Sequence, residues 1–165
     1  VVDQALANPA AFSSLVAALS AADGDLVNVL SGEGTFTVLA PDNDAFATFL
    51  NGAALGDVPT DALANILLNH VLGSVVTSTD LVGAGAGYTS TLASGPGMSN
   101  LSLYFNTSDG VVFNGISSVT AADVTASNGI IHIVDEVIGL PTIATFATSA
   151  DIATFATDLA NSINL

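Results

Sequence analysis

Apolar residues recur at helical spacing near the start of the chain. Phe12, Leu15 and Leu19 fall on one face of a helix that the Asn8-Pro9 pair opens. Asn8 can accept hydrogen bonds from the first-turn amides, and proline is well suited to the first helical position because its missing N–H is not needed there. The pattern therefore predicts an amphipathic helix that begins at this pair.

Two more helices and one strand are predicted before His70. Residues 35–40 alternate as a strand, and residues 42–50 form a short helix that its own first residues cap. A further helix starts near Pro59 and carries Leu63 and Leu67 along one face, with His70 at its end.

From Val71 onward the period of the pattern changes from about 3.6 towards 2, which is typical of strands. Turn-forming clusters at residues 83–87 and 94–97 separate the segments. The strand candidates are residues 71–76, 88–92, 101–105, 111–113, 116–120 and 130–134. Helices mostly precede strands, so the predicted fold class is α+β with antiparallel pairing.

The apolar faces of these elements define a predicted core. Its members are Phe12, Leu15, Leu19, Val38, Phe46, Leu63, Leu67, Ile131 and Ile133. A chain of 165 residues is long enough for one well-buried core of this kind.

Charge is the most unusual feature of the composition. The chain has 15 acidic residues, no Lys or Arg, and a formal net charge of −15. Each carboxylate must therefore be solvated, cap a helix or turn, or meet a cation or another chain. Nucleic acid is excluded as a phosphate-contacting partner, and anionic membrane surfaces are disfavoured. The charged fraction of 9% is nevertheless low for a halophilic surface.

Cysteine is absent, which excludes disulfides, thiolate metal sites and cysteine nucleophiles. We find no uninterrupted apolar run long enough for a transmembrane helix. Because the first residue is Val1 and not Met, we expect a processed product or a fragment, and a removed signal peptide fits this start.

Four motifs occur in a fixed order along the chain. They are TFTVLAPDNDAF at residues 35–46, Asn69-His70-Val71, NGIIHIVD at residues 128–135, and Leu140-Pro141. Their order and spacing resemble the fasciclin (FAS1) domain family over roughly residues 1–141. The resemblance implies a FAS1 wedge, in which antiparallel sheets pack against N-terminal helices, and it implies a place outside the cytoplasm.

The resemblance also gives the Asn69-His70 pair an expected role. The family usually has Tyr-His at this point, and that motif is tied to receptor adhesion in animal members. Asn69 stands here in place of the tyrosine. Asn69 and His70 are therefore candidate interaction residues.

Residues 142–165 continue beyond the expected end of the domain. Ile143, Ile152, Phe155 and Leu159 form a helical apolar stripe in this segment. The segment is interpreted as a helix of the same domain, as an assembly element, or as the start of a truncated second repeat. The predicted division is a FAS1 domain at residues 1–141 and a C-terminal helical segment at residues 142–165.

Candidate chemistry is sparse. His70 and His132 lack neighbours at metal-ligand or catalytic spacing, so both are interpreted as hydrogen-bonded structural residues. No serine lies in a nucleophile motif, and the chain is predicted not to be an enzyme. The glycine-rich run at residues 83–87 is interpreted as a flexible connection.

Two kinds of weak site remain. The pairs Asp42/Asp44 and Asp23/Asp25 offer oxygen ligands for Ca²⁺, the one cofactor candidate, although capping and turn formation explain them as well. Asn100 and Asn106 begin N-glycosylation sequons.

The functional hypothesis is a secreted or cell-surface FAS1 interaction module that acts in adhesion or extracellular matrix contact. The alternative is a structural protomer of an extracellular filament or layer, which assembles through its C-terminal segment. Both hypotheses imply protein partners or self-association, and the expected location is extracellular, at the cell surface or in the periplasm.

Overall fold

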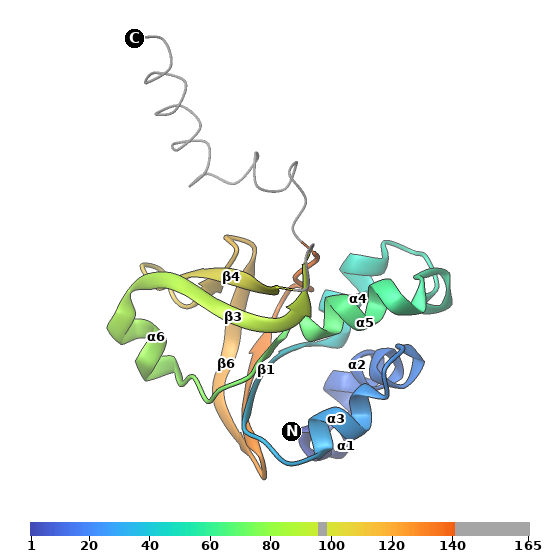
Figure 1. Ribbon diagram of the computed structural model, residues 1–165. Coiled ribbons are helices and arrows are strands. Elements are labelled where there is room, and N and C mark those ends of the chain that lie inside the picture. The colour runs from blue at the N-terminus through green and yellow to red at the C-terminus, as the bar shows by residue number, and fades with distance from the viewer. Residues whose placement is uncertain (96–98, 141–165) are drawn as a thin grey trace, which may run out of the picture.

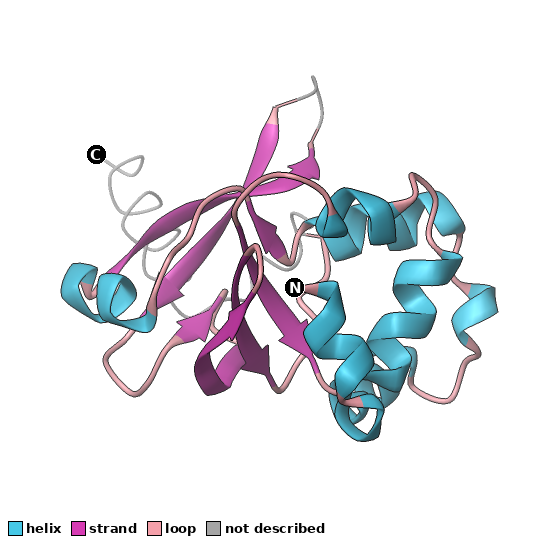
Figure 2. Ribbon diagram, turned by 90° about the horizontal axis from the view of Figure 1, so that it is seen from below, coloured by secondary structure: helices cyan, strands magenta, loops and turns pink. Residues whose placement is uncertain are grey.

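Helices and strands are segregated along the chain and in space. The computed structural model describes residues 1–95 and 99–140. Figure 1 shows helices α1 to α5 gathered on one side of the sheet, with α6 apart from them on the other side. Figure 2 shows the same division from below, with the strands between α6 and the other helices. The α+β fold class predicted from the sequence is confirmed.

The helices are short. They are α1 (Val2–Ala7), α2 (Pro9–Ala21), α3 (Leu26–Ser31), α4 (Asn43–Leu50), a 3-10 turn η1 (Leu55–Asp57), α5 (Thr60–Leu68) and α6 (Ser78–Ala84). The strands are β1 (Phe36–Pro41), β2 (Val71–Leu72), β3 (Ala86–Ser94), β4 (Asn100–Asn106), β5 (Val112–Phe113), β6 (Ser117–Ala126) and β7 (Gly129–Val134).

The strands of the described residues form a closed barrel in the order β1 to β7. Neighbouring strands pair antiparallel, as the sequence predicts, except that β1 and β7 pair in parallel. The parallel register runs from Phe36 beside Gly129 to Pro41 beside Val134. The two longest sequence motifs are therefore the two strands of the parallel pair, and this pair closes the barrel.

Three local predictions were wrong. The side chain of Asn8 makes no cap hydrogen bond; its carbonyl oxygen instead accepts from the N–H groups of Ala11 and Phe12. The strand expected over residues 71–76 stops at Leu72. The run at residues 83–87 is not a flexible connection, because its first two residues end α6 and its last two begin β3.

Helix α6 is started by hydrogen bonds at its first turn and not by an apolar stripe. The Thr77 hydroxyl accepts from the backbone N–H of Asp80, and the Asp80 carboxylate accepts from the backbone N–H of Thr77. This reciprocal capping box starts the helix. Gly85, at a φ of 76°, ends it in a conformation that favours glycine.

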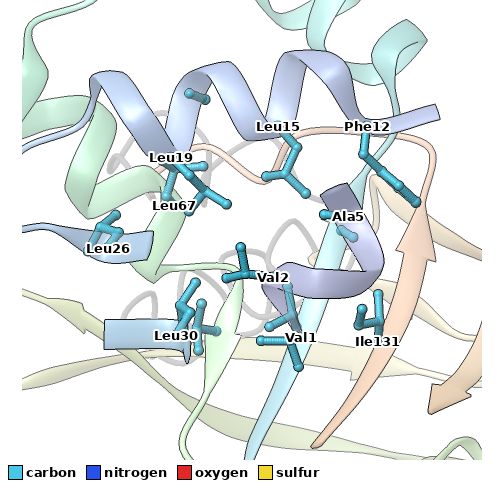
Figure 3. Close-up of a cluster of buried hydrophobic side chains, with 14 of the residues drawn as sticks. Val1, Val2, Ala5, Phe12, Leu15, Leu19, Leu26, Leu30, Leu67 and Ile131 are labelled. Carbon is cyan, nitrogen blue, oxygen red and sulfur yellow. The ribbon is translucent and has the colours of Figure 1, made fainter. Parts of the chain in front are cut away.

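The core has two layers that share strands β1 and β7. The helix-side cluster joins helices α1 to α5 to one face of the barrel and includes Val38 and Ile131, and Figure 3 shows part of it. The barrel-interior cluster includes Leu39 and Val134, which point the opposite way from the same strands, together with Phe113. Strand β1 is consequently covered on both faces, which explains why its buried run is nearly continuous.

The predicted core is confirmed except at Ile133, which is only half-buried. Ile133 packs against the helix-side cluster but lies between Ala40 on β1 and Ala121 on β6 in the strand register. The small side chains of these alanines cover less of Ile133 than larger neighbours would.

We expect Leu63→Ala to lower the free energy of unfolding by about 2–5 kcal/mol, because it leaves a cavity in the helix-side cluster. Leu63 is 1% exposed. The matched control is Leu6→Ala, where the same change falls on a side chain that is 55% exposed. Urea unfolding of both variants measures the difference; equal losses would contradict the assigned core.

Candidate functional site

Asn69 and His70 lie at the junction between α5 and β2, inside the domain. The backbone N–H of Asn69 donates to the carbonyls of Asn65 and Ile66, which continues the last turn of α5. The exposed fractions of the Asn69 and His70 residues are 0% and 3%. The turn at the end of the helix thus directs two polar side chains into the interior.

His70 joins the end of α5 to the last described residues. Its Nδ1 lies 2.8 Å from the carbonyl oxygen of Ile66, and its Nε2 accepts the backbone N–H of Ile138 at 2.8 Å. Since Nε2 accepts, Nδ1 carries the proton and the ring is neutral. Burial disfavours the charged ring and lowers the pKa of His70 to about 4.

Asn69 contacts the same segment. Its Nδ2 donates to the carbonyls of Ile138 and Gly139, each at 3.4 Å. Its Oδ1 lies 3.3 Å from the hydroxyl of Thr91 on β3. Asn69, His70 and Thr91 therefore form a buried clasp, which fixes residues 138–139 to α5 and β3. We call it the 69–70 clasp.

His132 on β7 makes a second link of the same kind. The residue is 1% exposed; its Nε2 lies 2.9 Å from the carbonyl oxygen of Val76, and its Nδ1 accepts the backbone N–H of Asp123 at 3.2 Å. In both imidazole rings, each nitrogen thus contacts a backbone group. Both histidines are buried and hydrogen-bonded to backbone groups, as expected from the sequence; their structural role stays a prediction.

The carboxylates use neutral donors. Asp42 caps α4 by accepting the N–H of Ala45 at 2.9 Å, Asp23 accepts from the Thr60 hydroxyl, and Asp25 accepts from the Asn28 amide. Asp44 is exposed in the first turn of α4. Among the described residues, no group of three or more His, Asp or Glu side chains is placed to hold a metal ion. Ca²⁺ binding at these four residues stays a prediction.

The two sequons begin at opposite ends of β4. Asn100 is exposed, and its Nδ2 donates to the carbonyl of Thr91 at 2.8 Å. Asn106 is half-buried, and its Nδ2 lies 3.4 Å from the Tyr104 hydroxyl. Glycosylation of either residue stays a prediction.

The remaining predicted interaction residues, Ile143, Ile152, Phe155 and Leu159, lie outside the described residues. The role of Asn69 and His70 in partner contact is a prediction, since the geometry shows only their contacts within the domain. None of the helices in the described part of the chain is both long and apolar enough to cross a membrane.

The sequence analysis missed two groups of residues. Thr91 completes the clasp, and nothing distinguishes it from the other threonines in the sequence. Tyr88 and Tyr104 pair across β3 and β4, with ring centroids 5.4 Å apart. The sequence could have suggested this pair, because these are the only two tyrosines of the chain and both fall in strand candidates.

The geometry defines a class of α+β domains in which helices flank a closed mixed barrel and a buried histidine fixes the chain beyond the last strand. Within that class, the chain belongs to the fasciclin family, whose model, described as Fasciclin domain, matches residues 10–141. The resemblance drawn from the four motifs is confirmed.

Relatives are found in bacteria and animals. Protein sll1483 of Synechocystis sp. is 42% identical over 77% of this chain and 66% of its own length. Transforming growth factor-beta-induced protein ig-h3 of Sus scrofa is 33% identical over 87% of this chain and 20% of its own length. The chain therefore spans less than two thirds of either relative.

A solved structure shares the fold. It is a FAS1 domain pair from the insect cell adhesion molecule Fasciclin I, which matches with a TM-score of 0.57 at 19% identity. The match covers 78% of this chain and 45% of the other.

The 69–70 clasp predicts a pH dependence of stability. The pKa of His70 is about 4 in the folded protein and 6.5 when unperturbed, so between these values the unfolded chain binds a proton that the folded chain does not. The free energy of unfolding should fall as the pH drops from 6.5 to 4, by on the order of 3 kcal/mol, with no further loss from this group below that range.

Urea unfolding across this pH range measures the effect, with His70→Gln as the comparison. Glutamine can still donate and accept hydrogen bonds but does not titrate. The variant should have a flatter pH profile even where it is less stable at neutral pH. Parallel profiles for the two proteins would contradict the assignment.

Proposed function

We propose that this chain is a secreted or cell-surface FAS1 interaction module that works in adhesion or extracellular matrix contact. The observation that carries the proposal is the family match over residues 10–141. The shared fold with a domain pair from an insect cell adhesion molecule supports it.

The chemistry of the described residues supports binding over reaction. Both imidazoles contact backbone groups through both ring nitrogens, so neither has a ring nitrogen left to move a proton to or from a substrate. The carboxylates of Asp42 and Asp80 cap the first turns of α4 and α6. Such a domain would act through its outer surface.

The net charge of −15 limits the kind of partner. An anionic partner would be repelled at long range, and this repulsion weakens as salt shortens the Debye length to about 10 Å at 0.1 M. Partners of this module are therefore uncharged or cationic, or they bind where cations screen the surface.

The proposal predicts saturable attachment to matrix. Beads coated with the full chain should bind matrix or cell-surface material of the source organism, and an excess of free protein should displace them. Beads coated with an unrelated protein of similar net charge are the control for electrostatic sticking. Equal attachment of both bead types, or no attachment of either, would contradict the proposal.

The alternative function is a structural protomer that assembles through residues 142–165. Two observations favour considering it: the apolar stripe in that segment and the clasp, which holds residues 138–139 just before it. The 69–70 clasp thus fixes described residues that shortly precede this segment in the chain.

The alternative predicts salt-dependent assembly. The full chain should associate at raised ionic strength or with divalent cations, and should stay dispersed in low salt with EDTA at neutral pH, because copies of a −15 chain repel each other. Deleting residues 142–165 should leave a folded monomer that does not associate. Light scattering and circular dichroism measure both outcomes, and unfolding of the shortened chain would contradict the alternative.

A further inference from the structure

The outer face of strands β3, β4 and β5 carries a cross-strand tyrosine pair. Side chains that share this face are identified by the strand register, which sets Tyr88 beside Tyr104, Ser90 beside Ser102, and Asn106 beside Val112. We call these six residues the tyrosine face. Figure 1 shows β3 and β4 on the side of the barrel away from α1, α2 and α3.

Tyr88 is the largest exposed side chain of this face. Its exposed fraction is 72%, although large aromatic side chains are usually well buried. Its ring lies 5.4 Å from that of Tyr104, centroid to centroid, with the two planes tilted by 57°. Within the described residues, the Tyr88 hydroxyl makes no hydrogen bond.

Tyr104 is held in place more firmly. Its backbone N–H donates to the side-chain oxygen of Asn114 at 3.0 Å, and its carbonyl oxygen accepts the backbone N–H of Asn114 at 2.8 Å. Asn106 reaches its hydroxyl at 3.4 Å. Asn114 adopts a φ of 50°, so the turn after β5 is shaped to make both contacts with the strand. The pair thus combines one tyrosine whose backbone is anchored on both sides by Asn114 with one tyrosine that is largely exposed.

The tyrosine face differs electrostatically from the rest of the chain. Strands β3, β4 and β5 contain no Asp or Glu, although the chain carries 15 acidic residues. At the border of the face, the Asp135 carboxylate accepts a hydrogen bond from the backbone N–H of Ser118 on β6 at 2.7 Å. The exposed Asp109 lies in the turn between β4 and β5 and not on the strands, so the strands themselves offer no carboxylate to a cationic partner. An anionic partner is repelled by the chain as a whole.

We propose that the tyrosine face binds an uncharged polysaccharide. Aromatic rings offer flat apolar surfaces on which the C–H faces of sugar rings stack, and the separation of the two tyrosines is close to the length of one pyranose ring. The hydroxyls of Ser90 and Ser102 beside them can donate to and accept from sugar hydroxyls, whereas the Asn106 side-chain oxygen already accepts from Ser108. The inference rests on the proposed function and names the partner class for matrix contact.

Tyrosine fluorescence reports directly on this site. The chain has two tyrosines and no tryptophan, and both tyrosines belong to the proposed site. Titration with cellohexaose, laminarihexaose and mannohexaose should give a saturable change with at least one of them. An alginate oligomer, which is anionic, should give none. Calorimetry on the same samples measures the Kd independently.

Tyr88→Ala should weaken binding by about tenfold or more, because an exposed aromatic anchor is lost. Tyr88→Phe keeps the ring and should retain most of the affinity. Val29→Ala on α3, at a side chain 45% exposed, is the control and should bind as the unaltered chain does. Because Tyr88 is largely exposed, its variants should keep the same thermal stability, which separates loss of binding from loss of fold.

The outcomes separate this inference from the function on which it rests. If Tyr88→Ala leaves bead attachment to matrix unchanged and the unaltered chain binds no saccharide, the inference is overturned and the proposed function stands. If saccharide binding depends on Tyr88 but the beads do not attach to matrix, the proposed function is overturned and the saccharide site stands. Loss of self-association in Tyr88→Ala, with no saccharide binding by the unaltered chain, would make this face a contact between copies and overturn the inference.

Discussion

The parallel pairing of β1 with β7 is the contact on which the other parts of the structure depend. It joins residues 36–41 to residues 129–134 and closes the barrel. The close approach at its start requires glycine: Gly129 has a φ of 150°, and an added Cβ would lie 1.9 Å from the carbonyl oxygen of Phe36. Its neighbour Asn128 accepts the Phe36 N–H through its carbonyl and donates to the carbonyl of Leu30 at 2.8 Å. One dipeptide therefore sets both the strand register and the position of α3, and both core layers follow from the two faces of this strand pair.

The absence of Lys and Arg imposes a second constraint, on how polar groups are paired. No buried side-chain nitrogen or oxygen among the described residues lacks a partner, and the pairing is achieved with amides, hydroxyls and imidazoles. Asp123 shows the pattern: it accepts from the backbone N–H and the hydroxyl of Ser78, and these bonds hold its pKa below the ordinary value. Asp80 has its pKa lowered by Thr77 in the same way. Short-range hydrogen bonds with neutral donors thus replace ion pairs, while the surface keeps its full negative charge.

Features of the fold could be predicted from the sequence where their cause lies within one short segment of the chain. Leu63 and Phe46 were assigned to the core correctly because their helices have regular apolar faces. Helix α6 was missed because its signal is a capping box and not an apolar stripe, and α1 and α3 because six residues are too few to show a period. The direction of the β1–β7 pairing and the contact from Asn69 to Gly139 join distant segments. Such pairings depend on the closed barrel, so the spacing of residues along the chain cannot reveal them.

The same pairing logic explains why the interior and the surface of this domain have different roles. Polar groups inside are held by partners on other segments, as His70 is held between Ile66 and Ile138, and a group held in this way contributes to stability but is not free to react. Residues free to meet a ligand must therefore lie outside the clasp and the barrel interior. Strands β3, β4 and β5 carry no carboxylate. Within the described residues, the exposed side chain of Tyr88 on β3 makes no hydrogen bond to the rest of the domain. An exposed side chain that the domain does not need for its stability can be altered without cost to folding, and surface recognition can therefore diverge between members of a family while the barrel stays the same.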